Sequence, residues 1–142
     1  MDRILGAARL HLVNPLMSLG IPWLVVLSSN DESQRGALIE LDQPTLILSR
    51  ADAAPIGDRV IKFDDSFMSS GHAILKRPQT ADRTDSFTVR DRDNPGPSVN
   101  GTFVNSRKLG LGEQVRLADG DIIKVGTAEL LFKSLWLPPV SS

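Results

Sequence analysis

The sequence predicts an all-β fold, built as an antiparallel sandwich or barrel. Short runs rich in Val, Ile, Phe and Thr recur after residue 20, and polar or glycine-containing turns separate them. The dipeptides Asn100-Gly101 and Asp119-Gly120 are typical of tight turns, because Asn and Gly adopt positive φ at low cost. No convincing amphipathic helix and no repeat of fixed period follows residue 20.

The expected strands are the apolar runs in chain order. They cover residues 23–27, 36–41, 45–48, 60–63, 72–76, 86–90, 102–104, 114–117, 122–125 and 129–132. The polar stretch 77–85 lies between two of these runs and is expected to close a hairpin. Trp23 and Trp136 are interpreted as packing residues.

The chain length corresponds to a single domain, with 142 residues and a mass of 15.4 kDa. Residues 21–134 are expected to form it. Residues 1–20 are expected to be an extension packed on or flanking the domain, and its apolar residues fall at the spacing of a short helix: Ile4, Leu5, Ala8, Leu12 and Val13. Pro15 would end such a helix, and residues 135–142, with two consecutive prolines, are expected to be a tail or linker.

Composition excludes several classes of function. Sixteen basic and seventeen acidic residues give a net charge of -1, which disfavours general binding to nucleic acid or to an anionic membrane surface. Without cysteine the chain has no disulfides, thiolate zinc sites or cysteine nucleophile, and His11 and His72 alone cannot form a multi-histidine cage. No metal or cofactor is therefore expected.

The apolar N-terminal region is too interrupted to cross a membrane. Arg3, Arg9 and Asn14 divide it into pieces shorter than the roughly 18 apolar residues of a membrane span. Asp2 and Arg9 also disagree with a secretory signal. These features and the lack of cysteine are compatible with a cytoplasmic protein.

Ser69, Ser70 and His72 follow two acids, Asp64 and Asp65, which raises the hypothesis of an esterase-like enzyme. A triad is defined by geometry rather than by proximity in sequence, and no Gly-x-Ser-x-Gly elbow is present. A histidine that closes a loop by bonding to its backbone is the favoured interpretation, so the chain is not expected to be an enzyme.

Four motifs in a fixed order are more specific than any single residue. They are Leu48-Ser49-Arg50, then Ser69-Ser70-Gly71-His72, then Asn100-Gly101-Thr102-Phe103-Val104-Asn105, then Leu117-Ala118-Asp119-Gly120-Asp121-Ile122-Ile123-Lys124-Val125-Gly126. This order resembles the forkhead-associated (FHA) domain, whose pattern is Gly-Arg, Ser-x-x-His, Asn-Gly-Thr-x-Val-Asn and Leu-x-Asp-Gly-Asp-x-Ile-x-Ile-Gly. The resemblance covers about residues 23–133.

The resemblance implies an antiparallel β-sandwich of about eleven strands, whose loops at one end bind phosphothreonine in an extended peptide. Arg50 aligns with the arginine that binds the phosphate, and Ser69 aligns with the serine whose hydroxyl and backbone bond to phosphate oxygens. Ser70 occupies a position that usually makes a second phosphate contact. Asn100 aligns with the asparagine that holds the peptide main chain, and Val99 adds apolar surface beside it.

Two further residues are expected to support the binding loops. His72 aligns with a histidine that braces the loops without touching phosphate, and Gly101 allows the chain to turn after Asn100.

The sequence departs from the family pattern at three positions. Ser49 replaces the glycine before the arginine, Val99 replaces a Ser or Thr, and Gly71 occupies a position that is commonly polar or basic. Besides Arg50, the basic candidates near the site are Arg107 and Lys108.

The expected function is therefore the binding of Thr-phosphorylated proteins in signalling by a Ser/Thr kinase. Such modules are often fused to an effector domain. The alternative is a degenerate scaffold that binds partners independently of phosphate through its β-surface. The third hypothesis, the esterase, is remote.

Overall fold

The computed structural model describes residues 21–51, 59–78 and 86–134. The expected N-terminal extension, most of the expected hairpin loop, and the C-terminal tail with Trp136 lie outside the described residues.

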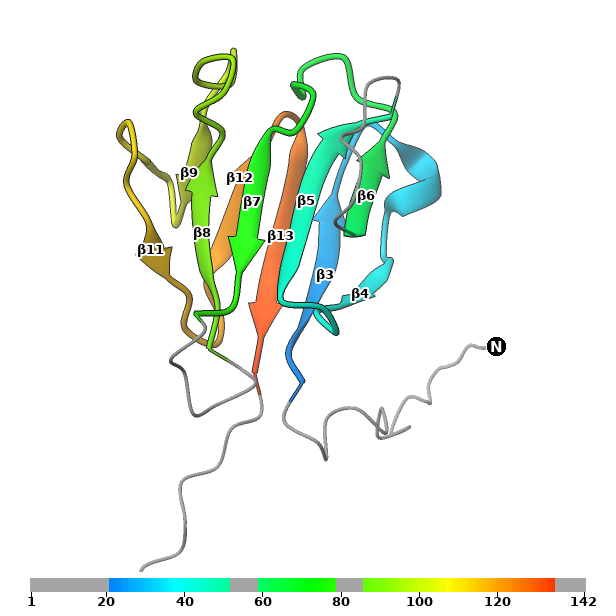
Figure 1. Ribbon diagram of the computed structural model, residues 1–142. Coiled ribbons are helices and arrows are strands. Elements are labelled where there is room, and N and C mark those ends of the chain that lie inside the picture. Colours follow the sequence, from blue (N-terminus) through cyan, green and yellow to red (C-terminus); the bar gives the residue numbers. More distant parts are fainter. Residues whose placement is uncertain (1–20, 52–58, 79–85, 135–142) are drawn as a thin grey trace, which may run out of the picture.

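Two β-sheets face each other and form a sandwich (Figure 1). The six-stranded sheet has the order β10 (Arg107–Lys108), β9 (Thr102–Val104), β12 (Ile122–Val125), β13 (Ala128–Lys133), β3 (Trp23–Ser28) and β4 (Leu38–Glu40). The five-stranded sheet has the order β11 (Val115–Arg116), β8 (Thr88–Asp91), β7 (Ala73–Lys76), β5 (Thr45–Arg50) and β6 (Arg59–Phe63). The predicted all-β sandwich is confirmed, and among the described residues a 3₁₀ turn, Glu32–Gln34, lies between β3 and β4.

One strand pair departs from the expected antiparallel arrangement. β5 and β6 run parallel, with Leu46 opposite Arg59 and Arg50 opposite Phe63. The eight residues between the two strands can span about 26 Å when extended, whereas β6 is only about 17 Å long. The chain is therefore long enough to return to the start of β5 and pair with it in parallel.

The core lies between the sheets and follows the two-residue alternation of the strands. Phe63, Phe87 and Phe132 are fully buried, and burial of each ring contributes roughly 1.5–3 kcal/mol relative to exposure. The aliphatic part of the core includes Leu24, Val26, Leu46, Leu48, Leu75, Val89, Ile123, Val125 and Leu130. The predicted packing residue Trp23 is also buried.

The outer face of the six-stranded sheet carries one row of apolar side chains. The register aligns Leu38, Val25, Leu131 and Ile122 across four neighbouring strands. Leu38 is 50% exposed and Ile122 is 37% exposed. We call these four residues the apolar row.

The loops that contain the predicted site lie at one end of the sandwich. β5 ends and β7 begins there. The connection from β8 to β9 and the turn from β12 to β13 lie at the same end (Figure 1). We call this end, formed by Arg50 and residues 65–72, 98–101 and 126–127, the loop end. The described chain enters β3 and leaves β13 at the opposite end, where Trp23 pairs with Lys133.

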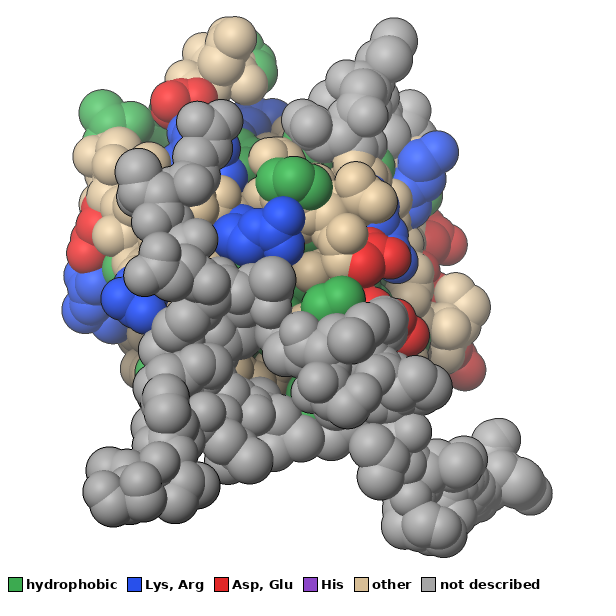
Figure 2. All heavy atoms as spheres, turned by 60° about the horizontal axis from the view of Figure 1, so that its bottom comes forward, with side chains coloured by type: hydrophobic (Ala, Val, Ile, Leu, Met, Phe, Trp, Pro, Cys, Tyr) green, Lys and Arg blue, Asp and Glu red, His purple; other side chains and the backbone are tan. Residues whose placement is uncertain are grey.

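Basic and acidic side chains occur near each other on the surface. Figure 2 turns the opposite end of the sandwich toward the viewer, and both signs of charge appear at the left and right edges of the visible described surface. Within the described ranges, no helix is long and apolar enough to cross a membrane.

Candidate functional site

Arg50 is the last residue of β5 and is attached directly to the loop that precedes β7. Its backbone N–H donates to the carbonyl oxygen of Ser69 at 3.1 Å. By strand alternation Arg50 shares the parity of Leu46 and Leu48, which are buried in the core. The half-buried Arg50 side chain therefore emerges between the sheets at the loop end rather than on the flank of the sheet.

Ser49, a departure from the family pattern, makes a second link between the same two segments. Its side chain is fully buried, and its hydroxyl accepts from the Gly71 N–H at 2.9 Å and donates to the Arg50 carbonyl at 3.0 Å. β5 remains paired with β6 through Ser49 and Arg50. A serine at this position is therefore accommodated within a continuous strand.

His72 connects two loops of the site. Its Nδ1 accepts from the Ser69 N–H at 2.9 Å, and its Nε2 bonds to the Gly101 carbonyl at 2.8 Å. This pair of bonds requires the neutral tautomer with the proton on Nε2. Burial lowers the pKa of His72 below 6.5, although the Gly101 carbonyl and the Asp91 carboxylate oppose the shift. Because backbone groups occupy both ring nitrogens, the arrangement is that of a structural histidine rather than a general base.

Ser69 links its own loop to the loop that carries Val99 and Asn100. The Ser69 hydroxyl accepts from the Val99 N–H at 3.0 Å. A hydroxyl that accepts one bond still has its proton to donate, and among the described residues the structure gives that proton no acceptor. The Ser69 side chain can therefore hold the neighbouring loop and donate to a ligand oxygen at the same time.

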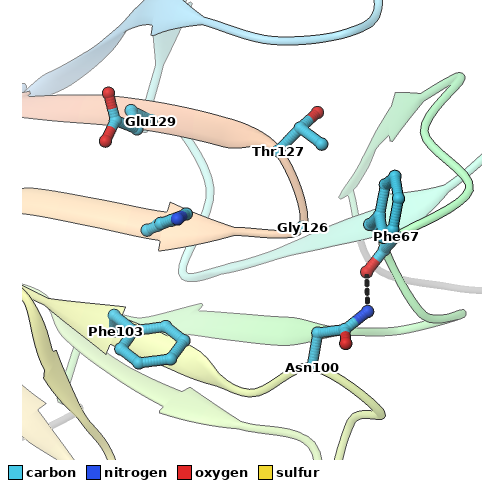
Figure 3. Close-up of a pocket in the computed structure, with 7 residues that line it drawn as sticks. Phe67, Asn100, Phe103, Gly126, Thr127 and Glu129 are labelled. Atoms are coloured by element: carbon cyan, nitrogen blue, oxygen red, sulfur yellow. Dashed lines mark hydrogen bonds between the residues drawn. The ribbon is translucent and has the colours of Figure 1, made fainter.

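Asn100 is exposed at the edge of the site and bonds across to a residue near Ser69. Its Nδ2 donates to the Phe67 carbonyl at 2.8 Å (Figure 3). The neighbouring Val99 side chain is 80% exposed. The structure thus brings the Arg50, Ser69 and Asn100 segments together, from strand ends that are distant in the sequence.

Asp91, at the end of β8, organises the turn before β9. It accepts from the Ser98 N–H at 2.9 Å, from the Ser98 hydroxyl, and from the Thr102 hydroxyl at 2.7 Å. Burial alone would raise the pKa of Asp91, but the bonds from Ser98 and Thr102 outweigh it and lower the pKa below 3.8. Gly101 has φ +84°, and its N–H donates to the Ser98 hydroxyl at 3.0 Å. Asp91 was not predicted from the sequence, because its partners follow it at no recognised spacing.

Asp65 connects the Ser69 loop to the turn between β12 and β13. Its carboxylate is almost fully buried and accepts from the Phe67 N–H and from both the N–H and the hydroxyl of Thr127. Gly126 has φ +59°, and a Cβ there would lie 2.8 Å from Asp65 Oδ2 and 3.1 Å from the Met68 backbone. Only glycine therefore fits this approach without strain.

Arg92 is a second guanidinium at the loop end that the sequence did not predict. It donates to three backbone carbonyls, those of Ser70 at 2.8 Å, Gly96 at 3.0 Å and Pro97 at 3.4 Å. These neutral acceptors orient the guanidinium but do not neutralise its charge.

The two basic candidates from the sequence occupy different positions. Arg107 forms an ion pair with Glu113 at 2.6 Å, and the bonds from Arg107 and Gly110 lower the pKa of Glu113. The Lys108 stem lies against Gly101, where a Cβ would be 2.7 Å from Lys108 Cε.

Two grooves flank the loop that carries Val99 and Asn100. The first, of about 470 Å³, is lined by Phe67, Asn100, Phe103, Lys124, Gly126, Thr127 and Glu129 (Figure 3). The second, of about 650 Å³, is lined by Asp91, Pro97, Ser98, Val99, Gly101, Lys108, Leu109, Gly110 and Leu111. We call them the Phe67 groove and the Lys108 groove. No group of three metal-ligating side chains occurs within the described part of the chain.

The sequence profile of the FHA domain matches residues 54–126, which is half of the chain. The chain belongs to the FHA domain family. FHA domains are non-catalytic, phosphothreonine-dependent protein-interaction modules. The match includes Ser69, His72 and Asn100, whereas Arg50 lies before its first residue.

Solved FHA domains share the fold of this one. The FHA domain of an Arabidopsis thaliana hypothetical protein is 22% identical with a TM-score of 0.64, and the match covers 86% of this chain and 92% of that one. The FHA domain of the CT664 protein from Chlamydia trachomatis is 25% identical with a TM-score of 0.60, over 80% of this chain and 96% of that one. The MEK1 FHA domain in complex with the HOP1 pThr318 peptide is 22% identical with a TM-score of 0.56, over 80% of this chain and 95% of that one. No curated protein sequence matches this FHA domain.

Proposed function

We propose that this FHA domain binds Thr-phosphorylated proteins and acts in Ser/Thr-kinase signalling. The observation that carries the proposal is the convergence of Arg50, Ser69 and Asn100 on one end of the sandwich, joined by the Arg50–Ser69 bond and the Ser69–Val99 bond. An exposed end with a guanidinium and a hydroxyl donor suits a phosphate, which carries nearly two negative charges and accepts several bonds.

Each residue has a distinct role in this proposal. Arg50 binds phosphate oxygens through its guanidinium, and the Ser69 hydroxyl donates to another while its oxygen holds the Val99 N–H. Ser70, half-buried on the same loop, makes the second contact from this loop. Asn100 holds the peptide main chain beside the phosphothreonine, and the exposed Val99 side chain contributes apolar surface for its methyl group.

The remaining features of the function extend the same proposal. The ligand is a protein phosphorylated by an upstream Ser/Thr kinase, and the domain operates in the cytoplasm, either alone or as the regulatory part of a larger signalling protein. The peptide complex of the MEK1 FHA domain supports the phosphothreonine ligand by likeness of fold.

Calorimetric titration with an oriented phosphothreonine peptide library, followed by its best single sequence, tests the proposal. We expect a micromolar Kd, on the order of -8 kcal/mol, and no binding of the unphosphorylated peptide. Arg50→Ala should remove most of the affinity, because charge-assisted bonds are the stronger ones.

Arg59→Ala is the matched control, since Arg59 pairs with Asp42 at the other end of the parallel strand pair. Equal affinity of wild type and Arg50→Ala would overturn the assignment of Arg50. Binding that survives phosphatase treatment of the ligand would overturn the dependence on phosphate.

The apolar row favours one alternative, a scaffold that binds an apolar protein surface independently of phosphate. Four aligned apolar side chains on an outer sheet face form the kind of surface that such contacts use. The double variant Leu38→Ser with Ile122→Ser separates the two functions. Under the leading proposal it leaves phosphopeptide affinity unchanged, whereas under the alternative it abolishes partner binding.

A further inference from the structure

Three hydrogen bonds meet at the end of β5, and two of them join this strand to the loop before β7. The Arg50 N–H donates to Ser69 O at 3.1 Å, the Gly71 N–H donates to Ser49 Oγ at 2.9 Å, and Ser49 Oγ–H donates to Arg50 O at 3.0 Å. The hydroxyl of Ser49 takes part in two of these three bonds. It therefore connects segments that are 22 residues apart in the sequence.

The environment of Ser49 makes this connection strong. The Ser49 side chain is 0% exposed, so water does not replace a partner that is lost. Removing the hydroxyl would leave the Gly71 N–H without its acceptor, and an unsatisfied polar group at a buried position is costly. Gly71 itself has φ +59°, a conformation that the loop must keep for the Gly71 N–H to reach Ser49.

The other contacts of the loop show what remains if Ser49 is removed. Ser69 is held by His72 and by the Val99 N–H, and the Ser70 carbonyl is held by Arg92. None of these contacts involves β5. The ends of the loop are held to β5 by the pairing of Phe63 with Arg50 and of Ala73 with Leu48. Between these ends, the Arg50–Ser69 backbone bond and the Ser49 hydroxyl both join the loop to the strand that carries Arg50.

We propose that Ser49 is a positioning residue that sets the spacing between the Arg50 guanidinium and the hydroxyls of Ser69 and Ser70. The inference rests on the proposed function, because the spacing matters only if these groups share one phosphate. Side chains held in place before binding lose less conformational entropy when the ligand arrives, so this link raises affinity without touching the ligand.

The experiment compares Ser49→Ala, Ser49→Gly and Ser49→Thr with wild type in titrations with the phosphothreonine peptide. We expect Ser49→Ala and Ser49→Gly to weaken binding by roughly tenfold, the equivalent of one lost hydrogen bond. Ser49→Thr keeps the hydroxyl and should restore most of the affinity. Ser86→Ala is the control, since Ser86 is a buried serine before β8 at the opposite end of the sandwich.

A double-mutant cycle separates positioning from general stability. If Ser49 acts by placing Arg50, then Arg50→Ala costs less in the Ser49→Ala background than in wild type. Additive effects of the two substitutions, or wild-type affinity of Ser49→Ala, would overturn the inference.

Hydrogen exchange provides a readout without ligand. The Gly71 amide should be protected in wild type and in Ser49→Thr, and it should exchange faster in Ser49→Ala. Equal exchange in all variants would disprove the link itself. Failure of wild type to bind any phosphothreonine peptide would instead overturn the proposed function, so the two failures are distinguishable.

Discussion

His72 Nε2 and the Gly101 carbonyl oxygen lie 2.8 Å apart, although the two residues are 29 positions apart in the sequence. The same imidazole receives the Ser69 N–H on its other nitrogen. One buried ring thus fixes the spacing between the loop of Ser69 and the loop of Asn100. The geometry makes His72 a direct link between these two loops.

Replacing His72 should affect stability, whereas replacing Ser69 should affect mainly binding. His72→Ala leaves the Ser69 N–H and the Gly101 carbonyl without partners and should cost roughly 2–4 kcal/mol of unfolding free energy. Ser69→Ala loses only the bond from the Val99 N–H, about 1 kcal/mol, but should weaken phosphopeptide binding by roughly tenfold. Denaturant unfolding and peptide titration of both variants provide the test. A His72→Ala protein that unfolds like wild type yet fails to bind would place the imidazole at the phosphate.

Stability should fall as the pH drops below the ordinary pKa of histidine. Burial lowers the pKa of His72 in the folded state, so the unfolded chain takes up this proton first as the pH falls below 6.5. The contribution of neutral His72 to the unfolding free energy is therefore full above pH 6.5 and is lost as the pH falls toward the lowered pKa. The contribution of Asp91, whose pKa is also lowered, is lost only as the pH falls below 3.8. Urea unfolding at several pH values between 7.5 and 4.5 gives the change of unfolding free energy with pH. This change should be smaller for His72→Gln than for wild type, and an identical change in both proteins would contradict the assignment.

Phosphothreonine should bind more tightly than phosphoserine. Burying the one additional methyl group is worth about 0.8 kcal/mol, which corresponds to about fourfold in Kd. Val99, 80% exposed beside Asn100, offers the apolar surface. Paired peptides that differ only in this methyl group should be titrated against wild type and Val99→Thr, which keeps the shape but adds a hydroxyl. If wild type binds both peptides equally, the methyl contact is absent.

Apolar residues near the phosphothreonine should be preferred through the Phe67 groove. The Phe67 side chain is 54% exposed, and Asn100 bonds to the Phe67 backbone rather than to its ring. Phe67→Ala should therefore reduce the preference for apolar over charged flanking residues several-fold and leave the Asn100 contact intact. Phe67→Leu, which keeps an apolar side chain, should retain most of the preference. Selection from a phosphothreonine peptide library with each variant measures the preference for apolar flanking residues. If Phe67→Ala selects the same flanking residues as wild type, the Phe67 groove does not cause the preference.

Arg92 should strengthen binding through its charge, since its guanidinium lies against the Ser70 carbonyl and, within the described ranges, bonds to neutral carbonyls. Arg92→Lys keeps the charge but loses the multiple carbonyl bonds, whereas Arg92→Gln loses the charge. We expect a roughly two- to fivefold weaker Kd for Arg92→Gln than for Arg92→Lys at low salt, and a smaller difference at high salt. Arg116→Gln, exposed on the edge strand β11, serves as the control. Equal Kd values for the Lys and Gln variants would show that Arg92 only braces the loops.

The strands could be predicted because their signal is local. The apolar runs at 45–48 and 122–125 became β5 and β12 with nearly the expected limits. β10 was missed because Arg107 and Lys108 alone carry no alternation, and the turn before it uses positive φ at Asn105 and Ser106, where Ser106 gives no turn signal of the strength of glycine. The parallel pairing of β5 and β6 was missed because the relative direction of two strands joined by a long connection has no local sequence signature.

The candidate site residues, as well as His72 and Gly101, were predicted through ordered motifs, whereas the contacts of two other groups that hold the loops were not. The Ser49 hydroxyl meets Gly71, and the Arg92 guanidinium meets Ser70, in each case 22 positions away in the chain. Such contacts arise only when the sheets assemble and bring the strand ends together. Ser49 stood in a motif only as a departure from its pattern, and Arg92 stood outside the motifs, so the sequence indicated neither contact.

The pairing of Trp23 with Lys133 has a practical consequence for handling the protein. The two points where the described domain meets the rest of the chain are adjacent, and a six-residue strand, about 20 Å long, separates them from the loop end. A biotin tag or a resin linkage attached at that end would orient the domain with its loop end away from the support and directed into solution. An affinity reagent could thus be immobilised through either junction, or through both, without blocking the face that captures the peptide.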